Sequence, residues 1–289
     1  MSGAEPRSPA SLALRRLLRN PAAVAGLMIS AILLVVGLLA PLLVSEEGYT
    51  AAIPGVAIKT APSLSGPLLG TDEQGRSVLH RIVRGATISL EIGVGSTILA
   101  VVFGTLVGAL SGYFRGWIDT VLQRITDTFM AFPTLLLAIG ITAIFDKPSA
   151  GILFVVLGIV SWPPVARVVR GQFLSLREQD YVLAARSLGA PHGRIILRHI
   201  LPNCIGPIVV LGTLEVASNI MAEAGMSFLG IGVQPPDPSW GRMLFDAQKY
   251  MSEAPWLLVF PSAAIVLTVL GLNFFGDGLR DAFDPKMKV

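Results

Sequence analysis

The chain has 289 residues, of which 53% are hydrophobic and 14% are charged. Soluble domains carry about 25% charged residues, so this composition excludes a soluble globular protein and indicates one embedded in a membrane. The net charge is only +3 and no basic face with interleaved aromatic residues is visible, so nucleic-acid binding has no support. The single cysteine, Cys204, excludes an intramolecular disulfide framework.

The apolar residues are grouped into runs of about 20 residues, the length at which a helix crosses a bilayer. These runs predict an all-α membrane protein with six transmembrane helices. Residues 1–21 form a short basic lead, and the first run, 22–44, contains no charged residue. This run is too long for the apolar part of a signal peptide and lacks a clear cleavage site, so we expect it to be a retained span.

Residues 45–86 are rich in Pro and Gly and become helix-prone near their end. We expect an external loop that contains an amphipathic helical segment. Gly70-Thr71-Asp72 indicates a turn that leads into this helix, with Thr71 or Asp72 as the candidate N-cap. Arg76, Arg81 and Arg84 give the loop an unusual positive charge, for which the sequence offers no explanation.

Five further spans are predicted between residues 87 and 277. The second span, Ile92–Tyr113, is rich in small residues, and its Gly104 and Gly108 form a G-x-x-x-G pair that allows helices to approach closely. The pattern is common by chance, and it is therefore weak evidence by itself.

The third span, about Val121–Phe145, carries Pro133 as a tolerated kink. Its Asp127 lies three residues after Arg124, so these two side chains are candidates for an ion pair. The fourth span, Ser149–Gln172, is interrupted by Trp162-Pro163-Pro164 and should be bent or broken there, because two prolines remove two backbone donors.

A polar, basic stretch then separates two apolar runs. Residues 177–203 read REQDYVLAARSLGAPHGRIILRHILPN. We expect one helix over Arg177–Leu188, a turn at Gly189 and a second helix over about Pro191–Ile200, with Arg194 and Arg198 on one face. The chain would thus leave the membrane, form a helix–Gly–helix hook and re-enter at Pro202. An amphipathic helix resting on the membrane surface is the alternative interpretation.

The fifth span, Asn203–Gly232, carries Glu215 and Glu223, which are about two turns apart. An ionisable group within a span marks a candidate polar pathway, so Glu215, Glu223 and Asp127 are candidate pathway residues. The alternative is that each carboxyl group bonds a neighbouring helix and fixes the packing. The sixth span is Ala254–Gly276, and a charged tail, 278–289, follows it.

Positive charge is distributed unevenly over the predicted loops. Six spans place both termini on the same side, together with the 177–203 hook. About two-thirds of the 22 lysine and arginine residues lie on that side. The positive-inside rule therefore predicts that both termini and the hook are cytoplasmic.

Four segments carry a family resemblance. In the hook, Ala184-Ala185, Gly189 and Leu201-Pro202 have the spacings of the "EAA loop" of bacterial ABC importer permeases, although Leu183 replaces its Glu and His199 its Ile. The segments LGTDEQGR, AEAGMSFLGIGVQPPDPSWGRML and NFFGDGLRDAFDP, with the hook, resemble permeases of the dipeptide, oligopeptide and nickel branch, in particular its C-type subunits. The resemblance covers about Leu12–Met287.

This resemblance implies a type I ABC importer permease fold with a cytoplasmic coupling-helix hook, in the inner membrane of a bacterium. The implied partners are a second homologous permease, two cytoplasmic ATPase subunits and an extracytoplasmic solute-binding protein. The implied cargo is a di- or oligopeptide, while nickel, glutathione or another small solute stays open. The implied ATPase-coupling residues are Ala184, Ala185, Arg186, Gly189, Ala190, Arg194, Arg198, Leu201 and Pro202. Contact with anionic lipid headgroups is the alternative role for the arginines.

Catalytic motifs are absent from the sequence. There is no G-x-x-x-x-G-K-[ST] phosphate loop, no H-E-x-x-H and no G-x-S-x-G, and the chain has only three histidines. We therefore expect a non-catalytic subunit without a cofactor of its own, with ATP and Mg²⁺ bound by partner subunits. A membrane-embedded enzyme and a secondary carrier that works alone are the competing hypotheses.

Overall fold

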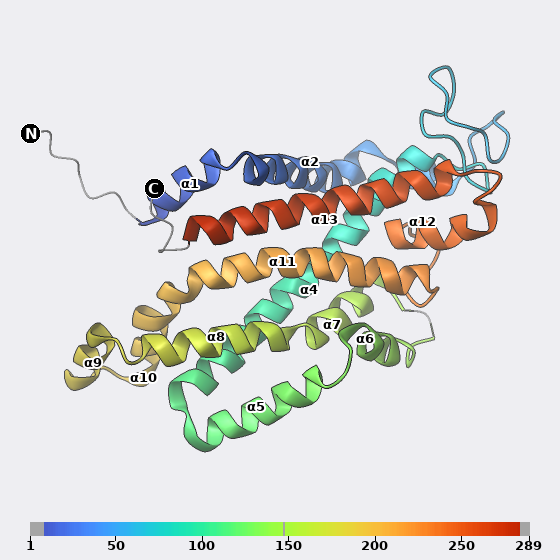
Figure 1. Cartoon of the computed structure of the whole chain (residues 1–289). Helices are drawn as coiled ribbons and strands as arrows, with labels where there is room; N and C mark the ends of the chain where they lie inside the picture. The colour runs from blue at the N-terminus through green and yellow to red at the C-terminus, as the bar shows by residue number, and fades with distance from the viewer. Residues whose placement is uncertain (1–8, 147, 284–289) are drawn as a thin grey trace, which may run out of the picture.

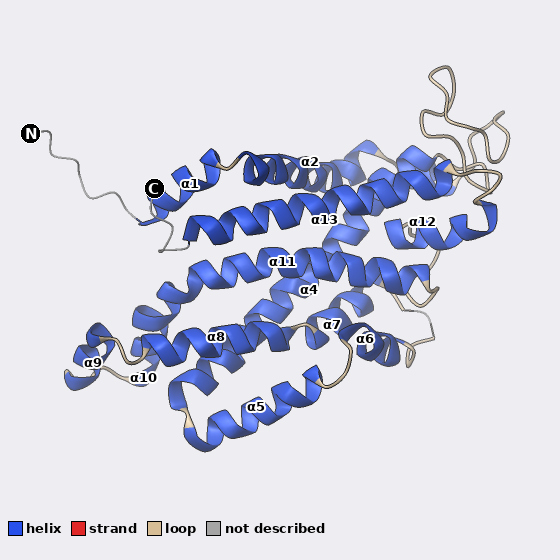
Figure 2. Cartoon of the chain, in the orientation of Figure 1, coloured by secondary structure: helices blue, strands red, loops and turns tan. Residues whose placement is uncertain are grey.

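The computed structural model describes residues 9–146 and 148–283. Over these ranges the regular structure is helical, with one isolated β-bridge between Thr71 and Ser77 and no β-strand (Figure 2). In chain order the helices are α1 (Pro9–Arg19), α2 (Pro21–Leu43), α3 (Glu46–Thr50), α4 (Val78–Phe114), α5 (Gly116–Met130), α6 (Thr134–Thr142), α7 (Ala150–Val160), α8 (Trp162–Leu176), α9 (Asp180–Ser187), α10 (His192–Arg194), the π-helix η1 (Ile195–Ile200), α11 (Leu201–Phe228), α12 (Trp240–Ala247), the 3-10 helix η2 (Gln248–Tyr250) and α13 (Trp256–Phe283).

The long helices form one bundle. In Figure 1, α2, α13, α11 and α8 run side by side, and α4 crosses behind them. Successive contacts join α2 to α13, α13 to α11, α11 to α4 and α4 to α8. The order of helices in space therefore differs from their order in the chain. Helix α4 lies at the centre of these contacts.

The two ends of the bundle have different elements. The hook with α9 and α10, the helix α1 and the C-terminal end of α13 lie at one end, which we call the hook end (Figure 1). The loop 51–77 and α12 lie at the opposite end, which we call the loop end. The predicted grouping of the hook with both terminal helices is thus seen in the structure.

Five helical segments of the described chain are long and apolar enough to cross a membrane, and they span Pro21–Leu43, Val78–Phe114, Ala150–Leu176, His192–Phe228 and Trp256–Phe283. A sixth span is formed if α5 and α6 act together, although these two helices are bent by 83°. This agrees with six predicted spans. However, the expected kink at Pro133 is a full break, since the chain turns over Ala131–Pro133 before α6 begins.

The second span begins earlier than the hydropathy pattern predicts. Helix α4 runs without interruption from Val78 to Phe114, so the helical segment expected in the external loop and the span that follows it are one helix. Its N-cap is Ser77, whose hydroxyl accepts a hydrogen bond from the backbone N–H of His80 at 3.3 Å. The prediction of Thr71 or Asp72 as the N-cap is therefore wrong.

The fourth span is interrupted as predicted. Helix α7 ends before Ser161, and Pro163 and Pro164 lie in the first turn of α8. Proline is tolerated there because the first backbone N–H groups of a helix have no acceptor within the helix. The two helices still pass as one membrane span, Ala150–Leu176.

Glycines permit a close contact between α4 and α8. A Cβ atom on Gly104 would lie 2.7 Å from the carbonyl oxygen of Trp162, and one on Gly108 would lie 2.5 Å from that of Ala166. Both separations are too short for real atoms, so only glycine lets α4 approach α8 this closely. The weak G-x-x-x-G signal in the sequence corresponds here to a real helix–helix contact.

Candidate functional site

The hook differs in its helix boundaries from the sequence prediction. Arg177 ends α8, and the first hook helix, α9, begins only at Asp180. The second predicted helix is divided into the short α10 and the π-helix η1, and η1 continues directly into α11. The second half of the hook is therefore continuous with a membrane span, His192–Phe228.

Gly189 makes the turn between the two halves. Its φ of +78° lies in the left-handed region, which residues with a Cβ rarely occupy. The N–H of Gly189 bonds to the carbonyl of Arg186 at 3.0 Å, and the N–H of Ala190 bonds to that of Ala185 at 3.1 Å. These two bonds form a Schellman motif, which confirms the prediction of a helix end at Gly189. A Cβ at this position would have nothing within 4 Å, so the constraint is conformational and not steric.

The inner face of the hook is anchored in the bundle. Val182 of α9 and Ile195 and Ile200 of η1 are fully buried. They pack in one apolar cluster with Phe173 of α8 and Tyr113 of α4. Each fully buried aliphatic side chain contributes about 1.5–3 kcal/mol, so the cluster fixes the hook firmly to the ends of α4 and α8.

Tyr113 is the polar centre of this attachment. Its hydroxyl is 2.8 Å from Nδ1 of His192, and its carbonyl oxygen accepts a hydrogen bond from Nη1 of Arg177 at 2.5 Å. The guanidinium carbon of Arg186 lies 6.0 Å from the centre of the Tyr113 ring. One residue of α4 thus contacts the end of α8 and both halves of the hook. Sequence reasoning missed Tyr113, because nothing in the local pattern indicates contacts so distant in the chain.

The outer face of the hook is apolar and basic. Leu188 is 88% exposed beside the Gly189 turn, and Leu197 is also strongly exposed. Arg194 and Arg198 are both exposed, and neither has an ion pair among the described residues. Of the remaining predicted coupling residues, Ala184, Arg186, Gly189 and Pro202 are exposed, and Ala185, Ala190 and Leu201 are partly exposed. A surface of this kind is typical of a protein contact, in which apolar anchors are surrounded by charge.

The predicted polar residues of the spans do not form one site. Asp127 bonds Nη2 of Arg167 on α8 at 2.8 Å, so its ion pair is not the predicted one with Arg124. Glu223 is fully buried and accepts hydrogen bonds from the hydroxyls of Ser89 at 3.0 Å and Ser227 at 2.7 Å. Its contacts therefore join α11 to α4, as the packing alternative predicts.

Glu215 has different surroundings from Glu223. It is only partly buried, whereas Glu223 has no exposed surface. Eight residues of helix rise separate them by about 12 Å along α11. Glu223 is thus occupied in packing, and Glu215 stays a candidate pathway residue by itself.

Comparison with known proteins places the chain in a family. Residues 104–289 match the model described as "Binding-protein-dependent transport system inner membrane component", and residues 8–62 match that of the "N-terminal TM domain of oligopeptide transport permease C". The chain is 43% identical to the dipeptide transport system permease protein DppC of Alkalihalophilus pseudofirmus, over 97% of this chain and 91% of that protein.

Two further relatives have other printed functions. The glutathione transport system permease protein GsiD of Pectobacterium atrosepticum is 46% identical over 76% of this chain and 73% of its own length. The oligopeptide transport system permease protein OppC of Haemophilus influenzae is 39% identical over 94% of this chain and 87% of its own length.

Among solved structures, the inward-facing MetNI methionine ABC transporter has a chain of similar fold. The TM-score is 0.58 at 21% identity, over 71% of this chain and 97% of that chain. The apolar helices and the family description agree on a multi-pass protein of the inner membrane. The chain belongs to the inner-membrane permease components of binding-protein-dependent ABC transport systems, in the branch of the dipeptide and oligopeptide permeases.

Proposed function

We propose that this chain is one of two permease subunits in an ATP-driven importer of di- or oligopeptides. A second, homologous permease would complete the translocation pathway, and an extracytoplasmic solute-binding protein would deliver the peptide. Two ATPase subunits would bind ATP and Mg²⁺, for which this sequence has no phosphate loop. The observation that carries the proposal is the hook, which is exposed and basic outside and fixed to α4 and α8 inside.

The attachment of the hook determines how force would pass into the membrane. A push on α9 and η1 is transmitted through the buried cluster and Tyr113 to the ends of α4 and α8. Helix η1 is also continuous with α11, so the hook and three spans move together. ATP binding in the partner subunits would in this way switch the permeases between inward-open and outward-open states as rigid bodies.

The proposal requires the hook end to face the cytoplasm. Leu188→Cys and Leu64→Cys test this, because the native side chains are 88% and 96% exposed at opposite ends, while the single native cysteine, Cys204, is buried. In intact cells, a membrane-impermeant maleimide should label Leu64→Cys at once and Leu188→Cys only after permeabilisation. The reverse pattern would contradict the orientation and with it the coupling role.

Docking of the ATPase is tested with the same pair of variants. In the purified complex, a short thiol–amine cross-linker on Leu188→Cys should join this chain to an ATPase subunit, and the yield should change when ATP is added. Leu64→Cys is the matched control and should give no such product. Labelling of the hook by a photoactivatable lipid, without any ATPase adduct, would favour the alternative role of the arginines at lipid headgroups.

Peptide specificity is supported by the named relatives, and glutathione is the second candidate because of the similarity to GsiD. Uptake of labelled dialanine into proteoliposomes that contain the whole complex and its binding protein distinguishes the two. Excess unlabelled di- and tripeptides should abolish this uptake, and excess glutathione should not. Uptake without ATPase subunits would instead indicate a carrier that works alone.

A further inference from the structure

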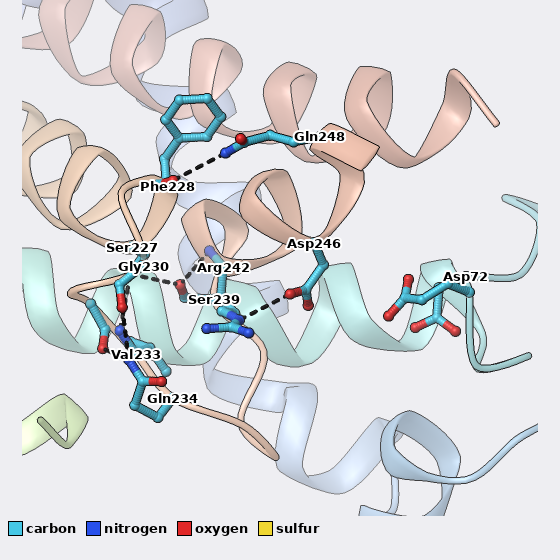
Figure 3. A network of polar contacts seen from close by, with 12 residues as sticks. Asp72, Ser227, Phe228, Gly230, Val233, Gln234, Ser239, Arg242, Asp246 and Gln248 are labelled. Carbon is cyan, nitrogen blue, oxygen red and sulfur yellow. Dashed lines mark hydrogen bonds and ion pairs between the residues drawn. The ribbon is translucent and has the colours of Figure 1, made fainter. Parts of the chain in front are cut away.

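Charged side chains bond one another at both ends of the bundle. At the loop end, Nε of Arg242 donates to Asp246 at 3.1 Å, and Figure 3 shows this pair on α12. At the hook end, Arg170 of α8 donates two hydrogen bonds to Asp119 of α5, at 2.6 and 2.7 Å. Helix α1 is different, because its sequence PASLALRRLLR has three arginines and no carboxylate. An anionic partner for this helix therefore has to come from outside it.

Helix α1 lies at the level where α2 enters the membrane. Asn20 alone separates the two helices, and its side-chain oxygen caps α2 by accepting hydrogen bonds from the N–H groups of Ala22 and Ala23 at 3.1 and 3.2 Å. Helix α2 is a candidate span of 23 residues. Its length of about 35 Å exceeds the hydrocarbon thickness of about 30 Å. Helix α1 therefore begins in the interfacial layer, and in Figure 1 it turns away from the line of α2 at the hook end.

One leucine fixes the rotation of α1 about its own axis. Leu17 is only 7% exposed and packs in a cluster with Ala23 of α2 and Ala282 of α13. Gly278 of α13 leaves room for it, because a Cβ atom on Gly278 would lie 3.2 Å from Cδ1 of Leu17. The docked face of α1 is thus known, and the other faces point away from the contact with α2 and α13.

The faces beside Leu17 are first apolar and then basic. Leu14 and Leu18 are 57% and 58% exposed and lie one turn apart. Arg15 and Arg19 are also one turn apart and exposed, and neither has an ion pair or hydrogen bond with a described residue. Successive residues of a helix are rotated by about 100°, so the leucine pair lies between Leu17 and the arginine pair. The helix therefore presents an exposed apolar column with an unpaired basic column next to it.

We propose that α1 is an interfacial anchor that binds the headgroups of anionic phospholipids. Leu14 and Leu18 would lie among the upper parts of the acyl chains, as in other amphipathic helices at a membrane surface. The aliphatic stems of Arg15 and Arg19 tolerate these apolar surroundings while their guanidinium groups reach the headgroup phosphates. A zwitterionic headgroup balances its own phosphate with an ammonium group, so the arginine pair favours lipids with a net negative charge.

The choice of leaflet rests on the proposed function, because the hook end and α1 would then face the cytoplasm. A basic residue next to an anionic membrane surface contributes about fivefold to binding, which corresponds to about 1 kcal/mol. Arg15 and Arg19 together should therefore prefer anionic over zwitterionic lipid by about 25-fold. The bound lipid would hold α1, and through Leu17 the C-terminal end of α13, at the membrane surface.

The test places a fluorescent reporter on α1 in the whole permease–ATPase complex in nanodiscs. Leu14→Cys is labelled with a small dye such as NBD, since the native Cys204 is buried and the partner subunits are made free of cysteine. Phospholipids with a doxyl quencher near the headgroup are added as phosphatidylglycerol or as phosphatidylcholine. Both should quench the dye, and half-maximal quenching should need about 25-fold less of the anionic lipid. The control is Leu64→Cys at the loop end, whose native side chain is 96% exposed and which should not be quenched.

Charge variants in the same labelled chain identify the groups that select the lipid. With Arg15→Gln and Arg19→Gln together, phosphatidylcholine should quench as before and the preference for phosphatidylglycerol should be lost. Both side chains are exposed and without a described partner, so folding should be preserved. Arg124→Gln is the matched control and should keep the preference, since Arg124 is an exposed arginine of α5 without an ion pair in the described ranges.

Each contrary result overturns a stated part of the inference. A dye that neither lipid quenches would show that α1 lies in water or is covered by another subunit, and the anchor would be wrong. Equal quenching by the two lipids with both arginines present, or a preference that survives their replacement, would overturn the anionic site. The quenching requires no transport, so the proposed function fails separately, through absent peptide uptake or a hook end that is labelled from outside the cell.

Discussion

Replacing Gly189 tests whether the hook couples ATP hydrolysis to uptake. Gly189 has a φ of +78°, and a residue with a Cβ in this region costs about 1–2 kcal/mol. A β-branched residue such as valine is the least tolerated there, whereas asparagine adopts this conformation more readily. Since a Cβ at this position meets no atom within 4 Å, Gly189→Val changes the backbone turn without creating a clash.

The expected magnitude follows from this strain. A cost of 1–2 kcal/mol lowers the population of the native turn about 5- to 30-fold, if the hook relieves the strain by changing its angle. In proteoliposomes with the complete importer, Gly189→Val should therefore take up much less peptide for each ATP hydrolysed. The bundle should stay intact, because Gly189 is exposed and lies outside every buried cluster.

Gly189→Asn is the matched control, and it should retain most of the coupling. The assay compares initial rates of peptide uptake and ATP hydrolysis in the same vesicles, with the amount of membrane-inserted protein measured in parallel. Uptake per ATP equal to the wild type in Gly189→Val would refute the reasoning. Equal loss in the valine and asparagine variants would also refute it, because the conformational argument predicts a difference.

Three further predictions concern packing, attachment and pH. Gly108→Val should destabilise the protein by about 1–3 kcal/mol in thermal unfolding in detergent, because its Cβ overlaps the Ala166 carbonyl, whereas Gly140→Val, with nothing near its Cβ, should not. Tyr113→Phe removes the bond to His192, worth about 0.5–1.5 kcal/mol, so the hook should become more sensitive to protease while the spans stay protected. Burial raises the pKa of Glu73 in the folded protein. The contribution of Glu73 to the free energy of unfolding is therefore most favourable below the ordinary glutamate pKa of about 4.3, where the side chain is protonated, and is lost as the pH rises through the raised pKa. The melting temperature of Glu73→Gln relative to wild type should increase with pH over that window. A constant difference would show that Glu73 does not titrate abnormally.

Sequence patterns that act over a few residues correctly predicted features that form within one short segment of the chain. The turn at Gly189 was predicted from its place after a helical segment, and its positive φ and two Schellman bonds confirm it. The interruption before Pro163 follows from the missing proline donors. The helix boundaries were less accurate, because α4 and η1 continue across segments whose polarity indicated a loop or a separate helix.

Contacts between helices were not predictable in the same way. Asp127 was expected to pair along its own helix with Arg124, but α8 brings Arg167 to it at 2.8 Å. The three loop arginines had no explanation in the sequence, and Arg81 lies between Asp72 and Asp246 because α4 meets both the loop and α12. Side-chain partners of this kind depend on which helices are neighbours.

The sequence by itself determined the membrane class, the approximate positions of the spans and the turn of the hook. Hydropathy, proline and glycine act over one or two helical turns, and one chain shows them directly. Only the tertiary structure decided that Tyr113 holds the hook to α4, that Glu223 bonds Ser89 and that Arg81 lines a charged cavity. The partners in the Tyr113–His192, Ser89–Glu223 and Arg81–Asp246 pairs are separated in the sequence by 79, 134 and more than 150 positions. Whether they meet depends on how whole helices pack, which no local pattern specifies.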